Sequence, residues 1–241
     1  FLPGNHDWGG LGGVDAVLRP APGDPGPAVV DLGRGLRLLM IDSQWWLEPQ
    51  SRTRREAAAE ALRRALAGAD DRALAVLAHH PTASAGEHAR APWSAALGFR
   101  RLLQNAGVLA QDLTSERYRD YVTTLRNNAI ATRRPLLMAG GHDHTLQLLV
   151  GREPGAAPWI VVSGAGSKSS VVRAHPDLRF HHAAPGYARL LVGRDGRVTL
   201  TFVAGPPDVL TCPVGPSQAD CIAAGAERVQ AVRTLRLRGT P

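Results

Sequence analysis

The 241-residue sequence is poor in lysine and in aromatic side chains. Lys168 is the only lysine, so nearly all of the 28 basic residues are arginines, and these are scattered along the chain rather than grouped in a stripe. Aromatic residues make up 5% of the sequence, so it offers neither the basic groove nor the stacking platforms of a nucleic-acid-binding protein. We therefore expect no nucleic-acid partner, whereas the net charge of +7 is compatible with an anionic substrate.

The sequence also lacks an apolar run long enough to span a bilayer, and no signal-peptide pattern opens it. Its two cysteines, Cys212 and Cys221, lie in a Pro/Gly-rich segment far from the histidine-containing motifs, which disfavours a shared metal site. The pair predicts a small disulfide loop, and the alternative is two unpaired thiols. Because a disulfide implies an oxidising compartment, we expect a periplasmic or secreted protein with any export signal upstream of Phe1.

Short apolar strands alternate with amphipathic helices, which is typical of a layered α/β fold. The expected strands are 28–31, 36–42, 73–78, 135–139, 145–150, 158–163, 187–192, 197–203 and 229–238, and the expected helices are 51–69, 99–104 and 114–131. His175, His181 and His182 are expected in a polar surface loop. Polar residues collect where strands end, which is where layered α/β folds place their sites.

The most informative stretch is Gly-His-Asp-His at 141–144, directly after the apolar run 135–139. Two histidines two residues apart in a turn beyond a strand can direct both rings into one site. Imidazole is the commonest protein ligand for borderline metals, so the motif favours a metal site. A pair of polar loop histidines is the alternative, and the motif by itself does not decide between them.

Other strand ends carry similar groups. Asn5 and His6 follow one presumptive strand end, His79 follows the strand 73–78, and His88 comes nine residues later in a loop of small residues. Such neutral nitrogen and oxygen ligands suit Zn, Mn or Fe rather than a thiolate site. Two such metals close together could clamp a phosphoryl centre and generate hydroxide near neutral pH.

A two-metal site needs carboxylates, and this sequence shows few in the right places. Asp7 and Asp143 each lie beside a candidate ligand, where we expect them to orient that ligand rather than to bind the metal. The visible ligands therefore make half a site, and we expect the missing acids upstream of Phe1.

Three motifs in this order resemble a known family: Gly-Asn-His-Asp at 4–7, His-His-Pro at 79–81 and Gly-His-Asp-His at 141–144. They are similar to the last three of the five signature motifs of the calcineurin-like metallophosphoesterases, and most similar to the purple (tartrate-resistant) acid phosphatase branch. The resemblance covers residues 1–204 and implies a four-layer α/β/β/α sandwich that here lacks its first strands and helix. Residues 205–241 are expected to form a C-terminal extension.

The resemblance also implies a ligand set. Carried over residue by residue, Asn5, His79 and His142 would bind one metal of a pair, and His144 would bind the other. The implied cofactors are two metal ions, Fe, Mn or Zn. The family's first two motifs, which supply the bridging aspartate and the remaining ligands, are absent from this sequence, so we expect the 241 residues alone to be inactive.

His6 and His88 would contact the phosphate and act on the leaving group. The implied reaction is hydrolysis of a small phosphate monoester by metal-bound hydroxide. The alternatives are a phosphodiesterase of the same superfamily and a non-catalytic phosphate-binding module. The sequence does not indicate an oligomeric state.

Overall fold

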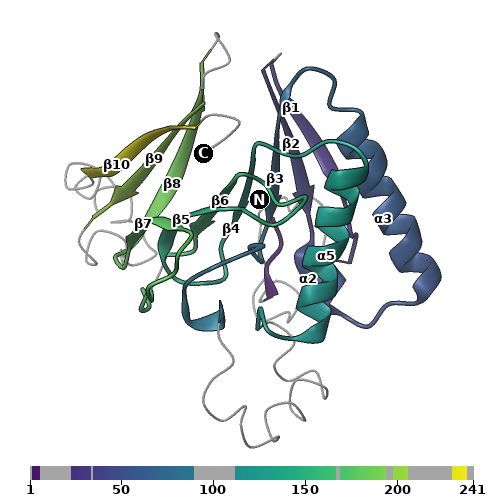
Figure 1. The fold of residues 1–241 in the computed structure, drawn as a ribbon, viewed down its shortest axis with the longest axis horizontal. Helices are drawn as coiled ribbons and strands as arrows, with labels where there is room; N and C mark the ends of the chain where they lie inside the picture. The colour runs from purple at the N-terminus through teal and green to yellow at the C-terminus, as the bar shows by residue number, and fades with distance from the viewer. Residues whose placement is uncertain are drawn as a thin grey trace, which may run out of the picture.

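The computed structural model describes residues 2–5, 23–33, 35–89, 112–166, 169–193, 198–205 and 230–237. The strands are β1 (Ala28–Leu32), β2 (Leu36–Ile41), β3 (Ala73–Ala78), β4 (Leu137–Gly140), β5 (Leu146–Val150), β6 (Trp159–Ser163), β7 (Leu178–His182), β8 (Gly186–Val192), β9 (Val198–Ala204) and β10 (Gln230–Leu237). The helices are α2 (Ser43–Leu47), α3 (Arg52–Ala67) and α5 (Glu116–Ala131), with a short 3-10 helix, η1 (Glu87–Ala89). Figure 1 shows the helices on one side of a large sheet and a small sheet on the other.

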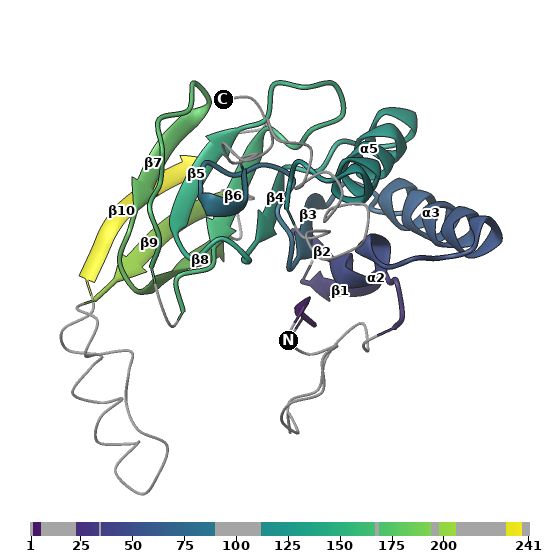
Figure 2. The same cartoon turned by 90° about the horizontal axis from the view of Figure 1, so that it is seen from below.

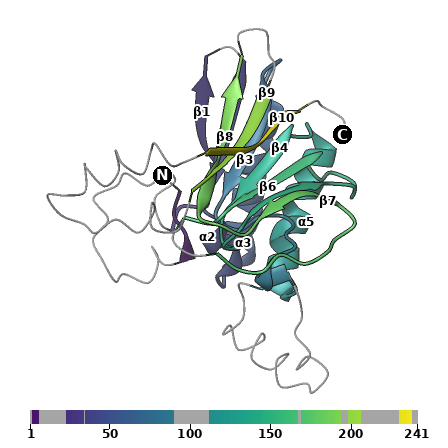
Figure 3. The same cartoon turned by 90° about the vertical axis from the view of Figure 1, so that its left-hand side faces the viewer.

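The large sheet is mixed. Its seven strands run in the order β1-β2-β3-β4-β6-β5-β7. The central strands β2, β3, β4 and β6 are parallel, while β1, β5 and β7 are antiparallel to their neighbours. A second, antiparallel sheet has the order β10-β9-β8 and lies in front of the large sheet in Figure 3.

One face of the large sheet packs against the helices, as Figure 2 shows from below. Strands contribute Leu39, Ile41, Leu74 and Val76; helices contribute Trp45, Ala58, Leu62, Leu66, Tyr118, Tyr121 and Leu125 to the same buried cluster. The stripe that recurs every four residues in α3 is therefore buried as expected. Ser51 caps this helix by accepting a hydrogen bond from the Arg54 N–H, and the helix ends at Gly68.

The opposite face packs against the small sheet, because alternate residues of a strand point to opposite sides. Leu36, Ala75, Leu137, Leu148 and Val161 meet Val198, Leu200 and Phe202 there. Between the two sheets lies an apolar cavity of about 680 Å³, lined mainly by leucine, valine and alanine side chains. Within the described residues the layers are therefore helices, large sheet and small sheet, three of the four layers expected.

The structure corrects one expectation and extends others. His181 and His182, expected in a loop, lie in the edge strand β7, whose Phe180 stacks on Phe202 of the small sheet with ring centroids 4.5 Å apart. The short helix α2 was not predicted. The expected strand over 229–238 is confirmed as β10, which joins the small sheet, so residues 230–237 add a strand to this layer. The expected helix 99–104 and the two cysteines lie outside the described residues.

Candidate metal centre

The parallel strands β2, β3 and β4 deliver polar groups to one edge of the large sheet. Strand β2 ends at Ile41, directly before Asp42 and Ser43; β3 ends directly before His79; and β4 ends directly before Gly141. Carboxyl ends of parallel strands meet at the same edge, which is why residues about 40 and 60 positions apart in the sequence become neighbours.

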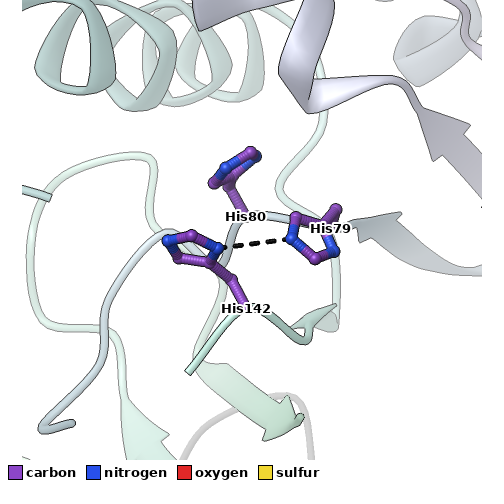
Figure 4. Close-up of side chains that lie close together, drawn as sticks. All are labelled: His79, His80 and His142. Carbon is purple, nitrogen blue, oxygen red and sulfur yellow. Dashed lines mark hydrogen bonds between the residues drawn. The ribbon is translucent and has the colours of Figure 1, made fainter. Parts of the chain in front are cut away.

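His79 and His142 meet at this edge. Nε2 of His79 lies 3.3 Å from Nδ1 of His142, and the ring centroids are 5.2 Å apart. With His80 they form a group in which one ring nitrogen from each residue lies within 4.8 Å of the others. Figure 4 shows the rings of His79 and His142 facing each other and the ring of His80 beside their contact.

His80 was not among the predicted site residues, yet it is the most deeply buried of the group, with a relative exposure of 0%. Its Nδ1 lies 2.9 Å from Oγ of Ser43, and the same oxygen accepts a hydrogen bond from the His80 N–H. Burial lowers the pKa of His80 well below 6.5, and the neighbouring rings of His142, His79 and His88 lower it further. The ring is therefore neutral near pH 7, as a metal ligand must be.

Backbone contacts fix the turn that carries His142. The Gly141 N–H donates to the His79 carbonyl at 2.8 Å, which ties the two motifs together. A β-carbon on Gly140 would lie 2.8 Å from the Pro81 nitrogen, so only glycine allows this approach. The backbone of His142 has a φ of 60°, which lies in the left-handed region that residues other than glycine seldom adopt. Such strain is concentrated at functional sites.

The backbone that leads into Asn5 lies beside His79, one of the two histidines that meet at this edge. A β-carbon on Gly4 would lie 2.8 Å from Nδ1 of His79, so the backbone just before Asn5 packs on the ring whose other nitrogen faces His142. The segment that carries the first motif therefore reaches the site. His6, expected to contact the phosphate, lies outside the described residues.

His88 also reaches the site, from η1. Its ring is tilted against that of His142, with centroids 4.3 Å apart. Its Nδ1 lies 3.3 Å from Oδ1 of Asp112, and this pairing raises the pKa of His88 above 6.5. The Asp143 and Glu87 carboxylates raise it further, against the opposing effect of partial burial. The structure thus brings a neutral imidazole, His80, and a readily protonated one, His88, close to the ring of His142.

Asp143 orients the loop that carries His88. Its carboxylate is fully buried, and Oδ1 accepts a hydrogen bond from the His88 N–H at 3.0 Å. Gly86 leaves room for it, because a β-carbon there would lie 2.6 Å from the carboxyl carbon. We expected Asp143 to orient the candidate ligand beside it in the 141–144 motif; the contact that the structure shows is with the backbone of the His88 loop instead.

Gln147, on β5, braces the same loop. Its Oε1 accepts from the Ala85 N–H at 2.8 Å, and its Nε2 donates to Oγ of Ser84 at 3.1 Å and to Oγ1 of Thr145 at 2.6 Å. Gln147 is fully buried. This role and those of Ser43 and Asp112 could not be predicted from sequence, because each depends on a contact between residues more than 20 positions apart.

His144 is half-buried in the same turn, and its carbonyl accepts a hydrogen bond from the Ser170 N–H at 2.9 Å. Within the described part of the chain it is not in the group formed by His79, His80 and His142. Its predicted role as a ligand of a second metal stays a prediction.

The donor set fits a borderline metal ion. It consists of imidazole nitrogens from His79, His80 and His142, with no carboxylate in the group among the residues described. Imidazole suits Zn, Fe and related ions, whereas Ca or Mg prefers oxygen ligands. The group can therefore hold one such ion.

The comparisons with known proteins rest on structure alone. No protein-family model matches the sequence, and no curated protein matches it. Among solved structures, PhoD superposes with a TM-score of 0.56 at 10% identity, over 88% of this chain and 42% of PhoD. The purple acid phosphatase PPD1 from yellow lupin seeds superposes with a TM-score of 0.52 at 13% identity, over 87% and 32%.

A third structure is GAP50, described as the anchor in the inner membrane complex of Plasmodium, with a TM-score of 0.50 and 15% identity, over 88% of this chain and 52% of GAP50. The chain thus spans between 32% and 52% of the length of these proteins. No helix in the described residues is long and apolar enough to cross a membrane. At these identities the likeness concerns the fold, and the chain has the layered, metallophosphoesterase-like α/β fold of the purple acid phosphatase and PhoD.

Proposed function

We propose that this chain belongs to a metal-dependent phosphoric ester hydrolase that acts on phosphate monoesters. One observation carries the proposal: in the fold of a purple acid phosphatase, the ends of β3 and β4 bring Nε2 of His79 within 3.3 Å of Nδ1 of His142, with the ring of His88 alongside. His79 and His142 belong to two of the three motifs that resemble those of the phosphatases, and the same resemblance implies a phosphate contact for His88.

The proposed ligands are Asn5, His79 and His142 for one ion and His144 for a second, which would be Fe, Mn or Zn. The contact of Gly4 with the His79 ring supports Asn5, and the shared turn supports His144. A bound divalent ion would polarise a phosphoryl oxygen and lower the pKa of a water molecule. The chain's own contribution is to hold neutral imidazoles at fixed separation and to orient the substrate.

His88 is the proposed proton donor to the leaving-group oxygen, with His6 as a second phosphate contact. Because Asp112 raises the pKa of His88, the ring stays protonated at a higher pH than an isolated imidazole. A protonated imidazole beside the phosphate stabilises its negative charge and can then release its proton to the departing alkoxide. The hydrogen bond from the His88 N–H to buried Asp143 holds the donor in place.

The first prediction tests the ligand assignment in the native, full-length protein. His79→Ala and His142→Ala should each abolish hydrolysis of p-nitrophenyl phosphate, a loss of at least about 100-fold, because each removes a direct metal ligand. Metal content measured on the same samples should fall in parallel. The matched control is His181→Ala, which removes an exposed histidine of β7 and should leave both unchanged. Full turnover by either site variant would reject the assignment.

The same assay separates the alternatives. Turnover of bis(p-nitrophenyl) phosphate in preference to the monoester would make the protein a phosphodiesterase. Metal and phosphate binding without turnover would make it a non-catalytic phosphate-binding module. The proposal also includes export of the protein, which cell fractionation would test directly.

A further inference from the structure

His80 holds a buried ring nitrogen that the proposed function does not use. The residue is fully buried, and its Nε2 has no hydrogen-bond partner. Buried polar atoms are nearly always satisfied, so such a nitrogen requires an explanation. The hydroxyls of α5 that point toward this turn do not supply one, because Tyr118 donates to the Pro81 carbonyl at 2.5 Å and Tyr121 donates to the His80 carbonyl at 3.3 Å.

Ser43 contacts Nδ1 of the His80 ring, and its hydroxyl is compatible with the ring form that carries its proton on Nδ1. Its Oγ lies 2.9 Å from both the His80 N–H nitrogen and Nδ1 of the same residue. A hydroxyl oxygen has two acceptor lone pairs, which match two donors, the backbone N–H and an Nδ1–H. With the proton on Nδ1, the lone pair of His80 lies on Nε2, the nitrogen without a partner. Metal-binding histidines show this arrangement, in which the nitrogen away from the metal donates to a neighbouring oxygen.

The His80 ring lies next to both of the histidines that are proposed to bind the ion, His79 and His142. It is 4.5 Å from the ring of His142 and 4.8 Å from that of His79, between centroids. The two nitrogens of His79 and His142 are 3.3 Å apart, and nitrogens that bind one tetrahedral zinc ion at about 2.0–2.1 Å lie about 3.3–3.4 Å from each other. The spacing of this pair therefore already matches two corners of such a site, and one ring nitrogen of His80 lies within 4.8 Å of a ring nitrogen of His79 and of a ring nitrogen of His142.

We propose that His80 Nε2 is a third nitrogen ligand of the ion held by His79 and His142, and that Ser43 is the positioning residue that fixes the tautomer needed for it. This rests on the metal site of the proposed function, but not on hydrolysis. It makes the site one with three imidazoles, whose softer nitrogen ligands select Zn or Co over Mg or Ca.

The test is metal binding by the 241-residue chain, measured by competition with a chromophoric chelator for Zn²⁺ and by the visible absorption of bound Co²⁺. His80→Ala should raise the dissociation constant about 100-fold and Ser43→Ala about 10-fold, the range found when metal sites lose a ligand or its hydrogen-bond partner. The Co²⁺ spectrum should change with His80→Ala. The matched control is Tyr121→Phe, which removes the hydrogen bond to the His80 carbonyl but leaves its imidazole intact; its affinity should be unchanged.

The outcomes separate the two proposals. Wild-type affinity and spectrum in His80→Ala, with binding lost in His142→Ala, would overturn the role of His80 and leave the proposed function standing. Wild-type binding in His79→Ala and His142→Ala would remove the metal site of the proposed function itself. An equal loss in Tyr121→Phe and His80→Ala would assign the effect to packing and overturn the inference.

A measurement on the wild-type chain covers the case in which His80→Ala does not fold. In ¹⁵N-labelled protein, the ring nitrogens of histidine report both tautomer and metal binding. Added Zn²⁺ should shift three nitrogens, Nε2 of His79, Nδ1 of His142 and Nε2 of His80, with the His80 proton on Nδ1. A shift at the first two alone, or a His80 proton on Nε2, would overturn the inference.

Discussion

At the scale of single residues, the surroundings of each imidazole set its pKa and therefore its charge. His80 is kept neutral by burial, whereas His88 is made easier to protonate by Asp112. Both rings lie within 4.5 Å of the His142 ring, between centroids. The two imidazoles thus differ in pKa because of their surroundings and not because of residue type, which is how one kind of side chain could serve the two roles proposed for them.

The second prediction concerns Asp112. In the native, full-length protein, Asp112→Asn should lower the pKa of His88, because it removes the negative charge that raises it. Since a general acid must be protonated, the alkaline limb of the pH–rate profile should move to lower pH, with activity on the acidic side of the profile changed less than that at neutral pH. Asp177→Asn is the control, since Asp177 pairs with exposed Arg152. An unmoved alkaline limb would separate Asp112 from proton transfer.

At the scale of elements, the turns after β3, β4 and β6 pack backbone against backbone. Gly141 bonds to the His79 carbonyl, Gly140 lies against Pro81, and Gly164 approaches the carbonyl oxygen of Asp143 so closely that a β-carbon would overlap it. Glycine is required at Gly140 and Gly164 for steric reasons, whereas the nearest atom to a β-carbon at Gly141 would be 3.8 Å away. The site geometry is therefore set by contacts between turns.

The third prediction compares two glycines of one turn. Gly164→Ala should destabilise the fold by about 1–3 kcal/mol, the usual cost of forcing a methyl group into a packed site, and should weaken Zn²⁺ binding because the turn at 141–144 must move. Gly166→Ala is the matched control, since nothing lies within 4 Å of a β-carbon there. Urea denaturation and chelator competition measure the two effects. Equal behaviour of the variants would show that this packing does not hold the site.

At the scale of the whole molecule, the site lies at the edge of a sheet whose two faces are buried by different layers. Helices α3 and α5 cover one face and the small sheet covers the other. Side chains at the strand ends are thus held by a core on both sides, and a buried histidine at that edge couples its protonation to the stability of the entire fold.

The fourth prediction follows from that coupling. In the metal-free protein with chelator, the free energy of unfolding should fall as the pH drops below about 6.5. In this range His80 binds a proton in the unfolded state but stays neutral in the folded state, where its pKa is lower. One such group contributes a slope of up to about 1.4 kcal/mol per pH unit. The loss continues down to the folded pKa, which lies well below 6.5.

Urea denaturation at several pH values measures this slope. His80→Phe should flatten it by removing the titrating group, whatever its effect on stability at neutral pH. His88 acts in the opposite sense, because its raised pKa adds stability below pH 6.5 that is lost as the pH rises through the folded value. An identical slope in wild type and His80→Phe would contradict the assignment of the proton to His80.

Much of the fold could be predicted from the sequence, because strands and helices follow local patterns. The stripe Ala58, Leu62, Leu66 predicted the buried face of α3, and the runs at 73–78 and 187–203 predicted β3 and the β8–β9 hairpin. Strand β7 was not predicted, because it is a partly exposed edge strand whose position depends on pairing with β5. Its alternation of apolar and polar residues is short and carries little signal without that partner.

The sequence by itself determined which chemical groups are present and that they follow strand ends, since the His79 and 141–144 motifs and the apolar runs before them are local features. Only the tertiary structure decided which of those groups meet. Parallel pairing of β3 with β4 brings His79 to His142, burial lowers the pKa of His80 while Ser43 contacts its Nδ1, and Asp112 lies beside His88. Distances between residues far apart in the chain depend on packing, and local sequence does not contain them.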